Sequence, residues 1–94
     1  MKMNRSIKTK WLKTLRSGKY SQGFGQLKSA DGYCCLGVLC EAMEVGFKGS
    51  SSYPSFKTLQ MAGLDKDVAD KLSGFNDFKR WSFEQIANWT EKNL

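Results

Sequence analysis

Residues 31–47 read Asp-Gly-Tyr-Cys-Cys-Leu-Gly-Val-Leu-Cys-Glu-Ala-Met-Glu-Val-Gly-Phe and join a turn signal to an apolar helical pattern. Apolar side chains recur here every three or four residues, which places them on one face of a helix that turns about 100° per residue. This face predicts a buried helix over about 36–46 that ends at Gly46. The residues that share the face are Leu36, Leu39, Cys40, Met43 and Phe47.

A β-hairpin is expected over about 20–35, immediately before this helix. Asp31-Gly32 separates two segments of alternating character, and a type I′ turn favours this dipeptide because both central residues need positive φ. The predicted strands lie near 22–28 and 33–35. Gly23-Phe24-Gly25 is only superficially like a phosphate-binding loop, because a dinucleotide fingerprint needs a third glycine where Lys28 stands. We expect these glycines to permit a bulge or a close backbone approach.

Capping residues and apolar periodicity predict four more helices. The clearest signal is the last one, because Ser82 and Gln85 form a capping box. Gly18, Gly63 and Gly74 are expected to end three others. The four predicted helices cover 5–17, 55–62, 65–73 and 82–93. Residues 1–94 are then expected to form one small α+β domain, mainly helical, with a single β-hairpin.

The positive charge of the chain is concentrated in its first third. Residues 1–30 carry eight Lys or Arg and no acid, a net charge of +8, whereas residues 31–94 carry seven basic and nine acidic residues, a net charge of −2. On the predicted helix over 5–17, cations such as Arg5 and Arg16 point away from the apolar face. Clustered cations attract phosphates and other anions. The sequence therefore predicts an anionic partner, with a merely solvated basic helix as the alternative.

The cysteines and the absence of histidine exclude several kinds of site. Cys34, Cys35 and Cys40 lie within seven residues, so they lack the two separated ligand pairs of a structural zinc site and the dispersed positions of a disulfide framework. A nucleophilic cysteine would have no imidazole base. We expect three buried, reduced thiols in a protein that is not an enzyme and that uses no metal and no cofactor.

Three segments carry the most distinctive pattern of the chain. They are Trp11-x-x-x-Leu15-Arg16-Ser17-Gly18-x-Tyr20-x-Gln22, then Tyr33-Cys34-Cys35-Leu36-Gly37-Val38-Leu39-Cys40, and then Asn76-Asp77 with Ser82-Phe83-x-x-Ile86-Ala87. Together they resemble a family of small accessory proteins of tailed bacteriophages and prophages. The resemblance implies a host cytoplasm and a role against a host process, such as defence, and no particular chemistry.

This chain departs from that family after the third segment. Family members have a polar, glycine-containing turn there, whereas this chain has Phe78-Lys79-Arg80-Trp81. Aromatic side chains of this segment and of the helix before it are more typical of a small core than of a stacking platform. We therefore expect Phe75, Phe78 and Trp81 to pack in the core.

The sequence predicts a binding protein that sequesters an anionic nucleotide and so antagonises a host process. Cations would hold the phosphates, an aromatic ring would stack on the base, and Gln22 would hydrogen-bond the base edge. So short a chain encloses a nucleotide most readily between protomers, which predicts a homo-oligomer. The predicted ligand-binding residues are Lys10, Lys13, Arg16, Lys19, Tyr20, Gln22, Phe24, Lys28 and Tyr33.

Two alternative functions stay open on the sequence. The protein could lay its basic helix on nucleic acid irrespective of base sequence, with an affinity that falls steeply as salt rises. It could instead inhibit a host defence protein directly, through that helix or through the serine-rich stretch 48–55, which is expected to be a mobile loop. No membrane partner is expected, because no stretch approaches the roughly 20 apolar residues of a membrane span.

Overall fold

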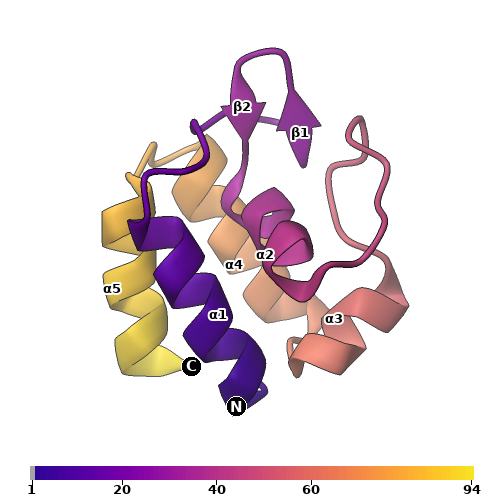
Figure 1. Ribbon diagram of the computed structural model, residues 1–94, viewed down its shortest axis with the longest axis vertical. Helices are drawn as coiled ribbons and strands as arrows, with labels where there is room; N and C mark the ends of the chain where they lie inside the picture. The colour runs from indigo at the N-terminus through magenta and orange to yellow at the C-terminus, as the bar shows by residue number, and fades with distance from the viewer. Residues whose placement is uncertain (1) are drawn as a thin grey trace.

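Residues 2–94 are described by a computed structural model, in which five helices pack together and one short hairpin lies at one end of them (Figure 1). The prediction of a mainly helical α+β domain with a single hairpin is confirmed. The two chain ends lie close together, at the end of the molecule opposite the hairpin. In chain order the elements are α1 (Arg5–Arg16), β1 (Lys28–Ser29), β2 (Gly32–Tyr33), α2 (Cys35–Met43), α3 (Phe56–Ala62), α4 (Lys66–Asp77) and α5 (Phe83–Asn93).

Helix α2 forms the centre of the core. Every residue from Cys35 to Cys40 is buried, as expected for a helix that is apolar on nearly all sides. Helices α1 and α4 pack against α2, and α5 packs against both α1 and α4. The indole Nε1–H of the fully buried Trp11 donates to the Cys35 carbonyl at 3.0 Å, so α1 is fixed to α2 by packing and by a hydrogen bond.

The hairpin turn lies one residue earlier than predicted. Ser29 pairs with Gly32, so Ala30 and Asp31 form the loop, and Asp31 does not have positive φ. The predicted type I′ turn at Asp31-Gly32 is therefore wrong. Gly32, at φ +146°, lies so close to the backbone of Ser21 that a Cβ atom would overlap it. This glycine is needed for a close chain approach and does not supply the turn.

The predicted strand over 22–28 is also wrong, except at its two ends. Gln22 forms an isolated parallel bridge with Tyr33, and Lys28 begins β1. Between them Gly25 adopts φ +84°, which turns the chain out of an extended conformation. The expected close approach is confirmed at Gly23, whose N–H donates to the Tyr33 carbonyl at 2.7 Å.

Two helices end at different residues from those predicted. Helix α2 stops at Met43, before Gly46, because Glu44 takes the left-handed conformation at φ +57° and closes the last turn. Helix α4 passes through Gly74 and continues to Asp77, because the next turn is anchored by buried side chains at 75 and 76. Helices α1, α3 and α5 lie within one residue of their predicted bounds.

The stretch 48–55 is held against the hairpin by backbone hydrogen bonds. The N–H of Leu27 donates to the Ser51 carbonyl at 2.8 Å, and that of Lys28 donates to the Gly49 carbonyl at 3.0 Å. These bonds satisfy the outer edge of β1 and tie down a segment that was expected to be mobile. None of the helices described is long and apolar enough to cross a bilayer.

Candidate anion-binding site

Four of the predicted ligand-binding residues lie together on the hairpin face. The rings of Tyr20 and Tyr33 meet edge to face at 4.7 Å between centroids, and the ammonium groups of Lys19 and Lys28 lie 5.5 and 5.4 Å from the two ring centroids. The Tyr33 hydroxyl donates to a Glu41 carboxylate oxygen at 2.9 Å. Burial, and then this hydrogen bond, raise the pKa of Tyr33. Each of these four side chains thus already has a contact partner within the protein.

Gln22 and Phe24, which were expected to contact a base, lie in different surroundings. The Gln22 amide donates at 2.8 Å to both the Asn76 side chain and the Trp81 carbonyl, so it points into the protein. Phe24 stays partly exposed beneath the guanidinium of Arg80, which lies 4.0 Å from the ring centroid. A base could therefore reach Phe24 and its cationic neighbour, whereas Gln22 serves the fold.

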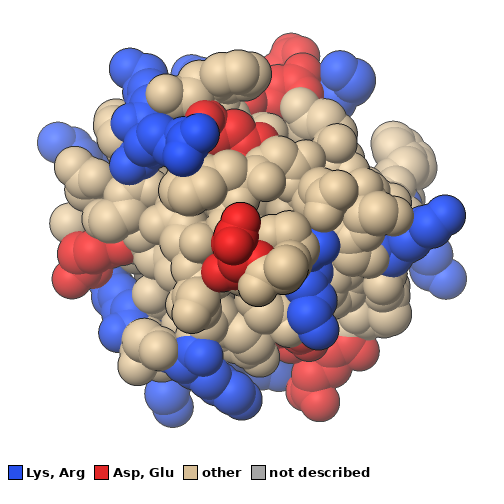
Figure 2. All heavy atoms as spheres, turned by 90° about the horizontal axis from the view of Figure 1, so that it is seen from above, with Lys and Arg blue, Asp and Glu red and all other residues tan. Residues whose placement is uncertain are grey.

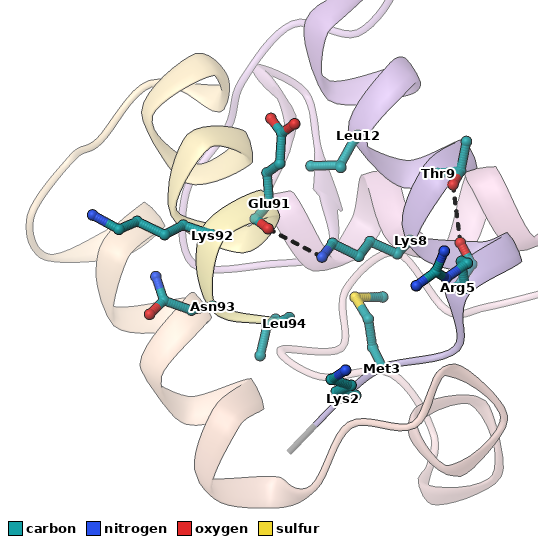
Figure 3. A pocket seen from close by; sticks show the side chains of 10 residues that line it. All are labelled: Lys2, Met3, Arg5, Lys8, Thr9, Leu12, Glu91, Lys92, Asn93 and Leu94. Carbon is teal, nitrogen blue, oxygen red and sulfur yellow. Dashed lines mark hydrogen bonds between the residues drawn. The ribbon is translucent and has the colours of Figure 1, made fainter.

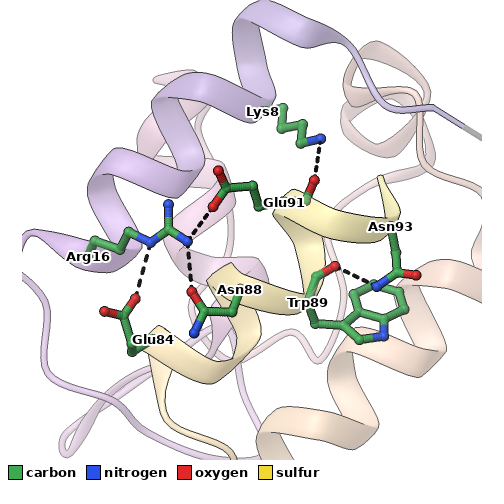
Figure 4. Close-up of polar contacts among 7 residues, drawn as sticks. All are labelled: Lys8, Arg16, Glu84, Asn88, Trp89, Glu91 and Asn93. Atoms are coloured by element: carbon green, nitrogen blue, oxygen red, sulfur yellow. Dashed lines mark hydrogen bonds and ion pairs between the residues drawn. The ribbon is translucent and has the colours of Figure 1, made fainter.

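Arg16 joins α1 to α5 (Figure 4). Its guanidinium forms ion pairs with Glu84 at 3.1 Å and Glu91 at 2.7 Å, and it donates to the Asn88 side chain at 2.9 Å. The hydrogen bond to Glu91 is the main cause that raises the pKa of Arg16. The expectation that Arg16 points away from the packed face of its helix is wrong, because α5 returns along that side.

Cations at the hairpin end do not merge into one patch. Figure 2 views this end and shows Lys and Arg side chains around the rim, separated by Asp and Glu side chains and by uncharged surface. On α1, Lys10 and Lys13 are exposed, and neither forms an ion pair with another described residue. The charges of these two lysines are therefore exposed to solvent.

A hollow of about 530 Å³ lies at the opposite end, between the start of α1 and the end of α5 (Figure 3). Its volume falls in the range of small-molecule sites, roughly 300–1,000 Å³. The apolar side chains of Met3, Leu12 and Leu94 form part of its wall, and the Met3 N–H donates to the Leu94 carbonyl at 3.3 Å. We call it the basic hollow; it is lined by Lys2, Met3, Arg5, Lys8, Thr9, Leu12, Glu91, Lys92, Asn93 and Leu94.

The electrostatics of the basic hollow favour an anion. Lys8 donates to the Glu91 carbonyl at 3.1 Å, which leaves two ammonium hydrogens for another acceptor. Lys2 and Arg5 add two further cations, while Lys92 points outward (Figure 3). Glu91 has the one acidic side chain among the described lining residues, and its carboxylate is turned away to the ion pair with Arg16.

Sequence reasoning noticed these cations but not the cavity that they share. Arg5 and Lys8 are three residues apart, a spacing that places both on one helix face. The opposite wall comes from residues 91–94, more than eighty positions later in the chain. No local pattern identifies that pairing, although three of the lining cations, Lys2, Arg5 and Lys8, belong to the run of cations in residues 1–30.

The three thiols lie in the core, as predicted, and all are free. Burial raises the pKa of Cys34 and raises that of Cys35 far more. Burial also raises the pKa of Cys40, from 9.0 to about 12. A neutral buried thiol is a poor nucleophile, so this cluster does not offer a reactive cysteine.

Alkaline solution is expected to destabilise the protein through these thiols. A thiol whose folded pKa is raised stabilises the fold fully below its unfolded pKa, near 9.0, and loses that contribution as pH rises through the folded pKa. The free energy of unfolding of wild type should fall above about pH 9, and Cys40→Ala should make the slope shallower by up to about 1.4 kcal/mol per pH unit. Urea titrations at several pH values measure both slopes. Equal slopes would contradict the assignment of this effect to Cys40.

Comparison with known proteins gives one family match. A family model described as "Domain of unknown function (DUF8296)" matches residues 3–51, which is 49 of the 94 residues and covers α1, the hairpin and α2. No curated protein and no solved structure matches the chain.

Proposed function

The chain belongs to the family described as domain of unknown function DUF8296, and we propose that it binds a small phosphate-bearing anion in the basic hollow and acts by holding that ligand. One observation carries the proposal. Lys2, Arg5 and Lys8 surround a cavity whose one acidic lining residue turns its carboxylate to Arg16. Phosphate oxygens would accept charge-assisted hydrogen bonds from these cations.

The apolar wall of the basic hollow supports a ligand that is more than bare phosphate. Met3 and Leu94 are buried, and Leu12 is half-buried, so they form a fixed surface beside the cations. A nucleotide has both parts that this surface suits: phosphates for the cations and a sugar and base for the apolar wall. We therefore propose a nucleotide, as the sequence suggested, with Lys2, Arg5 and Lys8 in place of Lys10, Lys13 and Arg16.

Arg16 has a positioning role in this proposal. It holds the Glu91 carboxylate at 2.7 Å and so keeps a negative charge from facing Lys8. The lining residues also favour holding over conversion, because the Thr9 hydroxyl is already bonded to the Arg5 carbonyl at 3.0 Å. The resemblance to bacteriophage accessory proteins supports a further part of the proposal: stoichiometric binding of a host nucleotide in the host cytoplasm. The shortness of the chain supports a homo-oligomer, in which a second protomer would enclose the ligand more fully.

A lysine exchange tests the site. Lys8→Gln should weaken binding of ATP and of inorganic triphosphate by roughly 10- to 100-fold, because a charge-assisted hydrogen bond is lost. Lys13→Gln is the matched control: it removes the same charge from the same helix, outside the hollow. Isothermal titration calorimetry gives the affinities, and native mass spectrometry gives the stoichiometry and the subunit count.

Other outcomes would favour the alternatives. Equal weakening by both variants, with affinity for an oligonucleotide that falls steeply with salt, would favour nucleic-acid binding along α1. Absence of any bound nucleotide, triphosphate or oligonucleotide would contradict both proposals that involve phosphate. The remaining alternative would then be direct inhibition of a host defence protein.

A further inference from the structure

The loop between α4 and α5 forms an exposed aromatic and cationic surface at the hairpin end, away from the basic hollow. Phe78 is 88% exposed, so its predicted place in the core is wrong. Phe24, which precedes the hairpin in the chain, also lies on this surface, next to Arg80, and is 38% exposed. By contrast, Phe75 is buried and stacks on the half-buried Trp81 at 4.1 Å between centroids. Phe75 and Trp81 thus pack against the core, whereas Phe24 and Phe78 are exposed.

Arg80 occupies an unusual conformation on this surface. Its φ is +56°, in the left-handed region that residues other than glycine avoid. Its Nε–H donates to the Asp77 carbonyl at 3.1 Å, and its guanidinium lies 4.0 Å from the Phe24 ring centroid. Backbone conformations of this kind cluster at ligand-binding sites, and they also end helices, as Glu44 does for α2.

The surroundings fix this arrangement. The Asp77 carboxylate accepts from the Gly25 N–H at 3.0 Å and from the Asn76 amide at 2.9 Å, which ties residues 23–25 to the end of α4. The donors to the Asp77 carboxylate are thus uncharged amide groups. Neither Arg80 nor Lys79 forms an ion pair with any residue from 2 to 94. Arg80 thus covers the partly exposed Phe24 ring without an ion pair, and the Lys79 ammonium lies 5.8 Å from the ring centroid of the half-buried Trp81.

We propose that Phe24, Phe78 and Arg80 form a stacking site for an unpaired nucleobase, with Lys79 and Arg80 holding the adjacent phosphate. A guanidinium that covers one ring has a second planar face, and bases stack on aromatic rings and on guanidinium planes. Its terminal N–H groups match phosphate oxygens in pairs. The ligand is a nucleotide unit, either free or within a single strand.

Probes with and without bases test the site. The probes are a labelled ten-residue thymidine single strand, an abasic strand of the same length, ATP and inorganic triphosphate. Phe78→Ala and Arg80→Lys should each weaken binding of the thymidine strand or of ATP by at least about fivefold, because one stacked base contributes roughly 5- to 150-fold. Phe78→Ala should change binding of the base-free probes less than twofold, whereas Arg80→Lys should also weaken binding of the abasic strand, because a lysine cannot match phosphate oxygens in pairs. Fluorescence anisotropy and calorimetry measure these affinities.

Phe56→Ala is the matched control. Phe56 is also an exposed phenylalanine, at 79%, but it lies on α3. It should leave all four affinities unchanged, and thermal unfolding should show that Phe78→Ala folds like wild type. If Phe78→Ala weakens binding of ATP alone, the ligand is a free nucleotide. If it weakens binding of the thymidine strand, the ligand is single-stranded nucleic acid.

Two results would overturn the inference: equal binding of base-bearing and base-free probes, or equal loss in Phe56→Ala and Phe78→Ala. Lys8→Gln keeps this outcome distinct from failure of the proposed function. That variant should lose triphosphate binding in the basic hollow while retaining the contribution of the base at Phe78.

Discussion

Gly37→Ala is expected to destabilise the protein by about 3 kcal/mol, a large part of the roughly 5–14 kcal/mol available to a domain of this length. Gly37 lies within α2, where the backbone of residues 27–28 crosses it. An added Cβ would overlap the Leu27 carbonyl oxygen and would lie 2.8 Å from its carbonyl carbon. Backbone atoms cannot rotate aside as a flexible side chain can, so the helix or the crossing segment would have to move.

The crossing segment has little freedom to move. The Leu27 side chain is buried, its carbonyl accepts from the Cys34 N–H at 3.2 Å, and its N–H donates to the Ser51 carbonyl at 2.8 Å. A shift of Leu27 would therefore break two hydrogen bonds, one to Cys34 just after β2 and one to Ser51 in the stretch 48–55. We expect both circular dichroism and tryptophan fluorescence to report this loss of stability.

Gly74→Ala provides the control, because Gly74 is also inside a helix but has no neighbouring heavy atom within 4 Å of a built Cβ. Alanine should stabilise the protein there by about 0.5–1 kcal/mol through helix propensity. Urea unfolding followed by circular dichroism measures both variants. Equal and small effects at the two positions would show that α2 and residues 27–28 are not in close contact.

The helices could be predicted because their signals are local. Asn4, Ser55, Asp65 and Ser82 each accept a hydrogen bond from a backbone N–H three residues later, so a cap and an apolar period suffice. The hairpin turn could not be predicted, because Gly32 carries the same turn signal whether it forms the turn or contacts Ser21. Only the course of residues 21–25 distinguishes the two roles.

The candidate site was predictable in charge but not in geometry. The excess of cations in residues 1–30 is a property of composition, and it directed attention to α1 as the predicted site of anion binding. Which cations share a cavity depends on α5, because Glu84 and Glu91 engage Arg16 and residues 91–94 complete the basic hollow. Pairs separated by 68 or more positions have no signature in a single sequence.

Asn76→Ala is expected to destabilise the protein by about 3–4 kcal/mol, because several buried groups lose their partners. Asn76 is fully buried and uses its whole amide. Its Oδ1 accepts from Gln22 at 2.8 Å and from the Cys35 N–H at 3.2 Å, and its Nδ2 donates to the Gly23 carbonyl at 2.9 Å and to Asp77. This one side chain thus joins the end of α4 to residues 22–23 and to the first residue of α2.

Asn88→Ala is the matched control for this prediction. Asn88 is exposed and accepts one hydrogen bond from Arg16, which already has two carboxylate partners. Its loss should cost less than about 0.5 kcal/mol. Urea unfolding at pH 7 compares the two variants, and similar effects would contradict a special role for Asn76.

Asn76→Asp separates the acceptor role of this side chain from its donor role. A carboxylate could still accept from Gln22 and the Cys35 N–H, but it could not donate to the Gly23 carbonyl, and it would lie beside Asp77. Burial and this neighbour should raise the pKa of the introduced carboxyl, so the variant should regain stability as pH falls and the group protonates. A protonated carboxyl restores one donor.

If acid restores stability, binding of a base at Phe24 and Arg80 should recover with it, because Asn76 and Asp77 together hold residues 23–25 in place. Recovery of stability without recovery of base binding would show that the stacking site does not depend on this anchor.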